Sequence, residues 1–148
     1  MGPIGSYAAL SPGIVRQWAM RVTGASHISF SVSDLDRSVR WYTEIFGAEV
    51  FLDETSDHRH AVVLTIPGTA LLIGICQFHE RQGGQFDPAH LGLDHFAFSV
   101  ETREDIDGCA ERLNDLGVEH SGAIDVPPGA ILNFKDPDGI ALALMWRR

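Results

Sequence analysis

The sequence has little cysteine, and the little it has follows no structural pattern. Its two cysteines, Cys76 and Cys109, both stand in apolar runs and lack CxxC spacing. A disulfide framework in a small domain uses roughly four or more cysteines, so none is expected. We predict two buried thiols and a reducing compartment.

Long hydrophobic runs and clusters of basic residues are also missing. No apolar run approaches the roughly 20 residues of a membrane helix, and the first residues lack the pattern of a signal peptide. Lys and Arg number 11 against 20 Asp and Glu, a net charge of -9, which disfavours binding to a phosphate backbone. We therefore expect a cytoplasmic protein with no membrane and no nucleic-acid partner. A chain of 148 residues, 45% hydrophobic, is long enough for one domain with one core.

The chain repeats a strand pattern that begins with a histidine. The run from His27 to Val32 reads HISFSV, and the run from His95 to Val100 reads HFAFSV. Both alternate, which predicts half-buried strands. Each His shares its face with small residues while the bulky residues point the other way, so we expect the two His faces to line a cavity.

A helix signal follows each strand at the same distance. Asp34 and Thr102 each stand seven residues after their His, and the helices are predicted to end at Gly47 and Gly117. The two apolar stripes at helical spacing are Leu35, Val39, Tyr42 and Phe46, and Ile106, Cys109, Leu113 and Leu116. The shared spacing indicates an internal duplication.

Three strand-like runs follow each glycine. They cover residues 48–53, 60–66 and 70–78, and then 118–124, 129–135 and 140–146. We predict an α+β fold of two βαβββ modules that form a curved eight-stranded mixed sheet around a central cavity. The expected organisation is a flexible lead-in at 1–21 and one domain at 22–148, divided into module one (22–79), a linker (80–92) and module two (93–148).

Several segments carry a family resemblance across residues 24–146. They are Ser26 to Val39 (SHISFSVSDLDRSV), Trp41-Tyr42, Phe46-Gly47, Gly92 to Phe98 (GLDHFAF) and Phe134 to Gly139 (FKDPDG). Together they resemble the vicinal oxygen chelate superfamily, the glyoxalase/bleomycin-resistance/dioxygenase group. The resemblance implies the paired βαβββ fold and a cavity that, in metal-using members, holds a divalent ion on the first and last strands of each module.

This resemblance implies metal ligands at His27 and His95. It does not extend to the carboxylate ligand that metal-using members have on the last strand. The last strand usually offers Glu where this sequence has Ala143, and the matching position in the first half is Gly74. Cys76 lies two residues beyond Gly74 on the same face and is a candidate third ligand, against its reading as a small buried hydrophobe. The implied cofactor is a divalent metal, Fe, Ni, Zn or Mn, held by an incomplete ligand set.

Apolar residues are predicted to complete a ligand pocket. We place Phe51, Phe78 and Phe134 along its walls with Gly74 and Ala143 at its small positions. Ordinary half-buried imidazoles are the alternative reading of the two histidines. His58 and His60 are expected in an exposed turn, and Trp41 and Tyr42 in the core.

Three functions follow as hypotheses from the implied fold. The first is a metal-assisted enzyme, a lyase, isomerase or dioxygenase, in which His27 and His95 hold an ion that polarises substrate oxygens. The second is a binding protein that sequesters a small molecule or antibiotic without chemistry. A third is a metal-free enzyme with His27 or His95 as general base. A homodimer is expected, and pairing of the modules within one chain or between two chains stays open.

Overall fold

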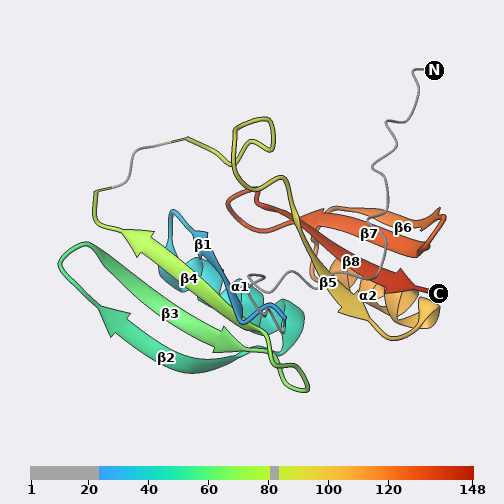
Figure 1. Cartoon of the computed structure of the whole chain (residues 1–148), viewed down its shortest axis with the longest axis horizontal. Coiled ribbons are helices and arrows are strands. Elements are labelled where there is room, and N and C mark those ends of the chain that lie inside the picture. The colour runs from blue at the N-terminus through green and yellow to red at the C-terminus, as the bar shows by residue number, and fades with distance from the viewer. Residues whose placement is uncertain (1–23, 81–83) are drawn as a thin grey trace, which may run out of the picture.

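The computed structural model describes residues 24–80 and 84–148, so the predicted lead-in at 1–21 lies outside the described residues. Each half contains one strand, one helix and three further strands (Figure 1). The elements are β1 (His27–Ser31), α1 (Leu35–Phe46), β2 (Glu49–Thr55), β3 (Arg59–Thr65), β4 (Leu72–Phe78), β5 (Phe96–Val100), α2 (Arg103–Asp115), β6 (His120–Val126), β7 (Gly129–Lys135) and β8 (Ala141–Arg147). The predicted α+β fold of two βαβββ modules is confirmed.

Local sequence explains where the two helices begin and end. The Asp34 side chain accepts a hydrogen bond from the Arg37 amide at the start of α1, and Thr102 forms a full capping box at the start of α2. Gly47 and Gly117 have φ of 61° and 67°, the left-handed conformation that glycine adopts without strain. Within the described residues, neither helix has the length and apolar character of a transmembrane segment.

The eight strands form two four-stranded sheets in the described part of the chain. Their orders are β1-β4-β3-β2 and β5-β8-β7-β6, with β1 parallel to β4 and β5 parallel to β8. The predicted strand limits are shifted by one or two residues at most ends. His60 lies within β3, opposite Thr55, where we had expected a turn, and its ring pairs with Asp53 at 2.7 Å.

Both sheets lie side by side with their helices behind them, and β1 and β5 form the facing edges (Figure 1). The apolar stripe of α1 reaches the second module, because the ring centroids of Phe46 and Phe98 are 4.6 Å apart. Strand β1 also reaches it, with the ring centroids of Phe30 and Phe96 6.2 Å apart. Buried residues of both halves belong to one cluster, including Leu64, Ile75 and Leu132. The helices cover one face of each sheet, which leaves the other face bare.

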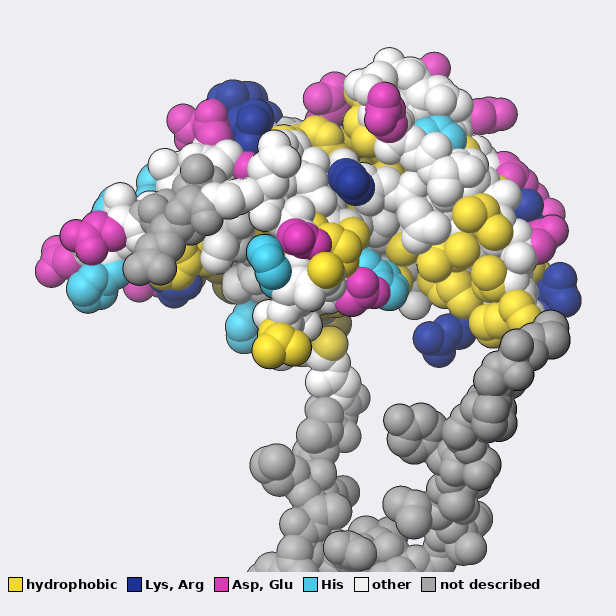
Figure 2. Space-filling model, turned by 90° about the horizontal axis from the view of Figure 1, so that it is seen from above, with side chains coloured by type: hydrophobic (Ala, Val, Ile, Leu, Met, Phe, Trp, Pro, Cys, Tyr) yellow, Lys and Arg dark blue, Asp and Glu magenta, His cyan; other side chains and the backbone are white. Residues whose placement is uncertain are grey.

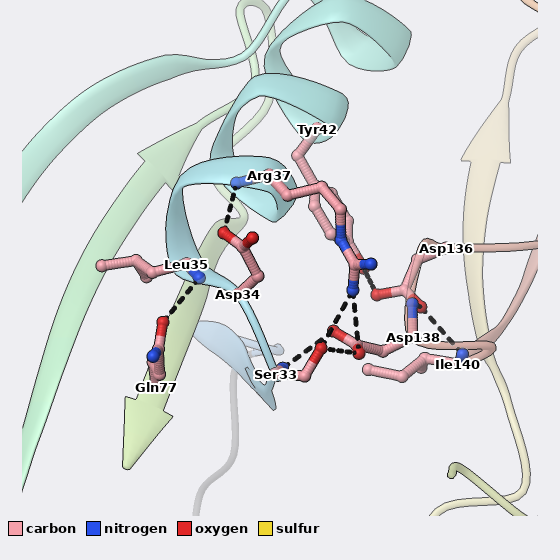
Figure 3. A network of polar contacts seen from close by, with 9 residues as sticks. All are labelled: Ser33, Asp34, Leu35, Arg37, Tyr42, Gln77, Asp136, Asp138 and Ile140. Carbon is pink, nitrogen blue, oxygen red and sulfur yellow. Dashed lines mark hydrogen bonds and ion pairs between the residues drawn. The ribbon is translucent and has the colours of Figure 1, made fainter. Parts of the chain in front are cut away.

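A polar junction joins the first module to the turn between β7 and β8 (Figure 3). Asp138 accepts hydrogen bonds from the backbone and hydroxyl of Ser33 and pairs with Arg37 at 3.0 Å. The buried hydroxyl of Tyr42 donates to Asp136 at 3.2 Å. Asp136 in turn accepts from the amides of Asp138 and Ile140, at 2.9 and 2.8 Å. The turn predicted at 136–139 therefore also fixes how the modules meet.

Candidate functional site

The bare face of the first sheet contains a hollow of about 240 Å³, here called the first-sheet hollow. Strand pairing sets its floor, because Ser29, Gly74, Val63 and Leu52 stand opposite one another across four strands. The remaining lining residues are His27, Phe51, Glu54, Arg59, Ala61, Leu72 and Cys76. The sequence alternation in β1 therefore does place His27 on a concave surface.

A β-bulge makes the side wall of this hollow. The register of β2 against β3 shifts between Val50 and Leu52, so Phe51 is an extra residue in its strand. A bulge allows two successive side chains to reach one face, and both Phe51 and Leu52 line the hollow. Phe51 is 66% exposed, so the wall is an apolar surface without a packing partner in the described chain.

At Gly74, in the centre of the floor, the side chain of Ser29 fills the space that a Cβ would take. A Cβ added there would lie 2.4 Å from the hydroxyl oxygen of Ser29 and 3.1 Å from its Cβ. A larger side chain at this position therefore meets β1 directly. The absence of a side chain at Gly74 lets the Ser29 side chain lie across the floor of the hollow.

One end of the hollow carries charge. The guanidinium of Arg59 donates to the Cys76 sulfur at 3.4 Å, and Glu54 lies on the same face. Cys76 is buried, as expected, and neither cysteine forms a disulfide. Cys109 is half-buried, and its burial raises the pKa of its thiol.

A second hollow of about 410 Å³ lies where the modules meet, here called the junction hollow. Ser29, Ser31 and Ser33 line it from β1 and the residues after it, while Asp138 and Ile140 line it from the second module. Linker residues complete its wall, namely Gly84, Gln85, Phe86, His90 and Leu93. Because Ser29 lines both hollows, the two are adjacent across β1.

His95 lines a different hollow, of about 350 Å³, on the second sheet. It stands just before β5 and its Nδ1 pairs with Asp94 at 2.6 Å, which leaves Nε2 free of protein partners in the described chain. Glu119, His120, Asn133 and Lys135 line the same hollow. The residues that line the His95 hollow all belong to module two, and those around His27 all belong to module one.

The predicted pocket residues do not all lie together. Phe51 and Gly74 line the first-sheet hollow. Phe78 is 41% exposed and lines none of the three hollows described above. Phe134 borders the His95 hollow but belongs mainly to the core, at 4% exposure, and Ala143 is fully buried in the middle of the second sheet.

The donor set fits a metal ion poorly. Within residues 24–80 and 84–148, no group of three or more His, Cys, Asp or Glu side chains is placed to hold an ion. Gly74 offers no donor and no space for one, and buried Ala143 replaces the expected carboxylate. The Cys76 sulfur already accepts from Arg59. The described residues therefore do not form a site that fits a divalent ion.

Sequence reasoning missed Arg59 and Asp136. The signal for Arg59 was its alternation with Ala61 and Val63, which places its side chain on the bare face. Asp136 is buried, and desolvation raises the pKa of its carboxyl despite the amides that bind it. Burial and the same carboxylate raise the pKa of Tyr42.

Charge on the surface agrees with the sequence. Figure 2 shows exposed hydrophobic side chains beside histidines and acidic residues, and the Lys and Arg side chains on this face are scattered. The strongly negative net charge is thus not offset by a basic patch on the visible face.

Comparison with known proteins places the fold in a family. The model of the Glyoxalase/Bleomycin resistance protein/Dioxygenase superfamily matches residues 24–144. The chain belongs to this superfamily. A glyoxylase/bleomycin resistance protein/dioxygenase domain from Frankia sp. EAN1pec is 38% identical, with a TM-score of 0.80, and the match covers 86% of this chain and 100% of that one.

Curated members of the superfamily are more distant. Metallothiol transferase FosB of Bacillus licheniformis is 29% identical over 126 residues, which are 80% of this chain and 72% of the relative. Biphenyl-2,3-diol 1,2-dioxygenase 3 of Rhodococcus globerulus is 27% identical over 122 residues, or 77% of this chain. The chain spans only 58% of that dioxygenase. The curated relatives therefore include a metallothiol transferase and a dioxygenase, two enzymes named for different reactions.

Proposed function

We propose that this superfamily member binds a small, largely apolar molecule in the first-sheet hollow, without a resident metal. The observation that carries the proposal is a hollow of about 240 Å³ that combines an apolar wall, Phe51 and Leu52, with a few polar groups, among them Arg59 and Glu54. Small-molecule sites typically combine apolar walls with a small number of placed polar groups. Sequestration of an antibiotic or another natural product is the form of this function that needs no further residue.

Ligand screening by thermal shift tests the proposal, with and without added divalent metal. A ligand that binds only the folded state raises stability by about 2.7 kcal/mol when its concentration is 100 times its Kd. We expect stabilisation by small aromatic compounds that is the same in chelator as in metal. Stabilisation that requires metal would contradict the proposal.

Phe51 and Phe78 provide a matched pair of variants for this site. Both are exposed aromatic residues of the first sheet, and only Phe51 lines the hollow. Phe51→Ala should weaken binding about tenfold, the equivalent of about 1.4 kcal/mol, by removing the apolar wall. Phe78→Ala should leave Kd unchanged. Equal effects of the two substitutions would place the ligand elsewhere.

The partner in solution is proposed to be a second copy of the chain. The bare faces of both sheets carry exposed apolar side chains, including Leu52 at 47% and Ile124 at 43% exposure. A two-fold dimer would cover such residues and close the hollow from water. Light scattering should give twice the monomer mass, and Ile124→Glu should reduce it towards the monomer value. A monomer at all concentrations would exclude the dimer.

The second candidate is a metal-assisted enzyme, favoured by the names of the relatives. FosB is a metallothiol transferase, and the two matching histidines of this chain each stand in a hollow. A dimer would be needed to bring His27 of one copy to His95 of the other. Elemental analysis of protein purified without chelator tests this candidate. It requires a stoichiometric ion that is lost in the His27→Ala, His95→Ala double variant.

We place the protein in the cytoplasm because of its unpaired cysteines. We also retain module limits of 22–79 and 93–148 as the expected units of the fold. Limited proteolysis should cut first in the linker between them.

A further inference from the structure

We infer that the ligand of the first-sheet hollow carries an acidic group, and that Arg59 binds it. This inference rests on the proposed binding function and names the class of ligand: an elongated molecule with an apolar body and a carboxylate at one end. Arg59 is half-buried at one end of the hollow.

The position of Arg59 follows from the sheet register. His27 stands opposite Leu72, and Leu72 opposite Thr65, six residues after Arg59 on β3. The guanidinium of Arg59 contacts Cys76, four residues after Leu72 on β4, so at about 3.3 Å per residue it lies about 13 Å from the row that contains His27. Between the two ends lie Gly74 and the apolar residues of the floor and wall. The hollow therefore suits a long molecule with different chemistry at its two ends.

The bonding of Arg59 leaves most of its donors unused. A guanidinium has five N–H donors, and the side chain of Arg59 makes one hydrogen bond in the described chain, to the sulfur of Cys76 at 3.4 Å. Sulfur is a weak hydrogen-bond acceptor. No carboxylate of residues 24–80 or 84–148 lies within ion-pair distance of this guanidinium, although Glu54 lines the same hollow. A bidentate carboxylate would satisfy the geometry of the free donors.

Two features of the protein oppose an anion, namely its net charge and the Glu54 carboxylate in the same hollow. The net charge of -9 slows the approach of any anion, and Glu54 repels one that has arrived. Close contact outweighs both effects, because a charge-assisted bond at a half-buried guanidinium is stronger than repulsion through water. Substitution of Arg59 and of Glu54 should therefore change the affinity for an acid in opposite directions.

Three probes of one shape test the charge preference: phenylbutyrate, its primary amide and phenylbutylamine. Calorimetry with the full chain should give the acid a Kd about tenfold lower than that of the amide, with the amine weakest. Arg59→Gln should remove the advantage of the acid and leave the amide unchanged. Glu54→Gln should tighten binding of the acid by a few-fold.

The outcomes separate this inference from the proposed function. If acid and amide bind equally, or the amine binds best, Arg59 does not select an acid, while binding of the amide that is lost in Phe51→Ala still supports the hollow. If Arg59→Gln weakens all three probes alike, its role is structural and the inference is wrong. If none of the three probes binds at millimolar concentration, the hollow is not a binding site and both statements fall.

Discussion

Removal of one hydroxyl group at Tyr42 should weaken the junction between the modules without disturbing its packing. The ring of Tyr42 is fully buried and stacks on Phe30 and Phe46, with centroids 5.9 Å away in each case. Tyr42→Phe keeps these contacts and removes only the bond to Asp136. The Asp136 carboxylate keeps its two amide donors but loses the hydroxyl donor, so part of its charge becomes unpaired in the core.

The expected cost is about 2 kcal/mol. A hydrogen bond to a charged group contributes about 1.5–3 kcal/mol to stability, and the 3.2 Å distance places this one near the lower half of the range. For a chain of this length, that loss lowers Tm by roughly 4–8 °C. Denaturant unfolding should show a lower midpoint with an unchanged slope, since the surface exposed on unfolding stays the same.

The cost should also depend on pH. Burial raises the pKa of Asp136 above its ordinary 3.8. Between the unfolded and the folded pKa, the folded state therefore holds a proton that the unfolded state has released, and stability falls as pH rises through this interval. The bond from Tyr42 lowers that pKa, and its loss raises it further. The deficit of Tyr42→Phe should therefore be larger at about pH 7 than at about pH 4.

A double-mutant cycle isolates the interaction. In an Asp136→Asn background the partner charge is absent, and Tyr42→Phe should cost at least about 1 kcal/mol less than in the native chain. A cost within about 0.5 kcal/mol of zero in the native background would refute this account of the junction, as would an additive cycle or a deficit that ignores pH.

Other expectations concern backbone and turn chemistry. Gly129→Ala should cost more than about 3 kcal/mol of stability, because its Cβ would lie 1.9 Å from a backbone oxygen of β8. Gly108 stands in open space on α2, so Gly108→Ala should stabilise the fold by up to about 1 kcal/mol. The midpoints of urea unfolding compare the two variants. Gly74→Ala should lower Tm by an amount that Ser29→Ala partly restores, and additive losses would show that their contact is not the cause. Thr102→Ala removes the acceptor for an amide at the start of α2 and should cost about 1 kcal/mol, a loss that Thr102→Ser should largely avoid.

Local chemistry in the sequence determined the repeat and the helix ends. His27 and His95 start matching strand patterns, and the caps at Asp34 and Thr102 act on amides within three residues. The two alternating strands could be read in the same way, because side-chain direction in a strand has a period of two residues. These features depend on neighbours in sequence, so the sequence alone was enough to predict them.

Only the tertiary structure decided which groups meet. Arg59 and Cys76 are 17 residues apart, and Tyr42 and Asp136 are 94 apart, yet each pair is in contact. Strand register and the packing of α1 against the second module create these contacts, and neither is encoded in a local pattern. The same limit applies to the two histidines. The sequence predicted that the His27 and His95 faces line a cavity, but it could not show that the hollow around each is built from its own sheet.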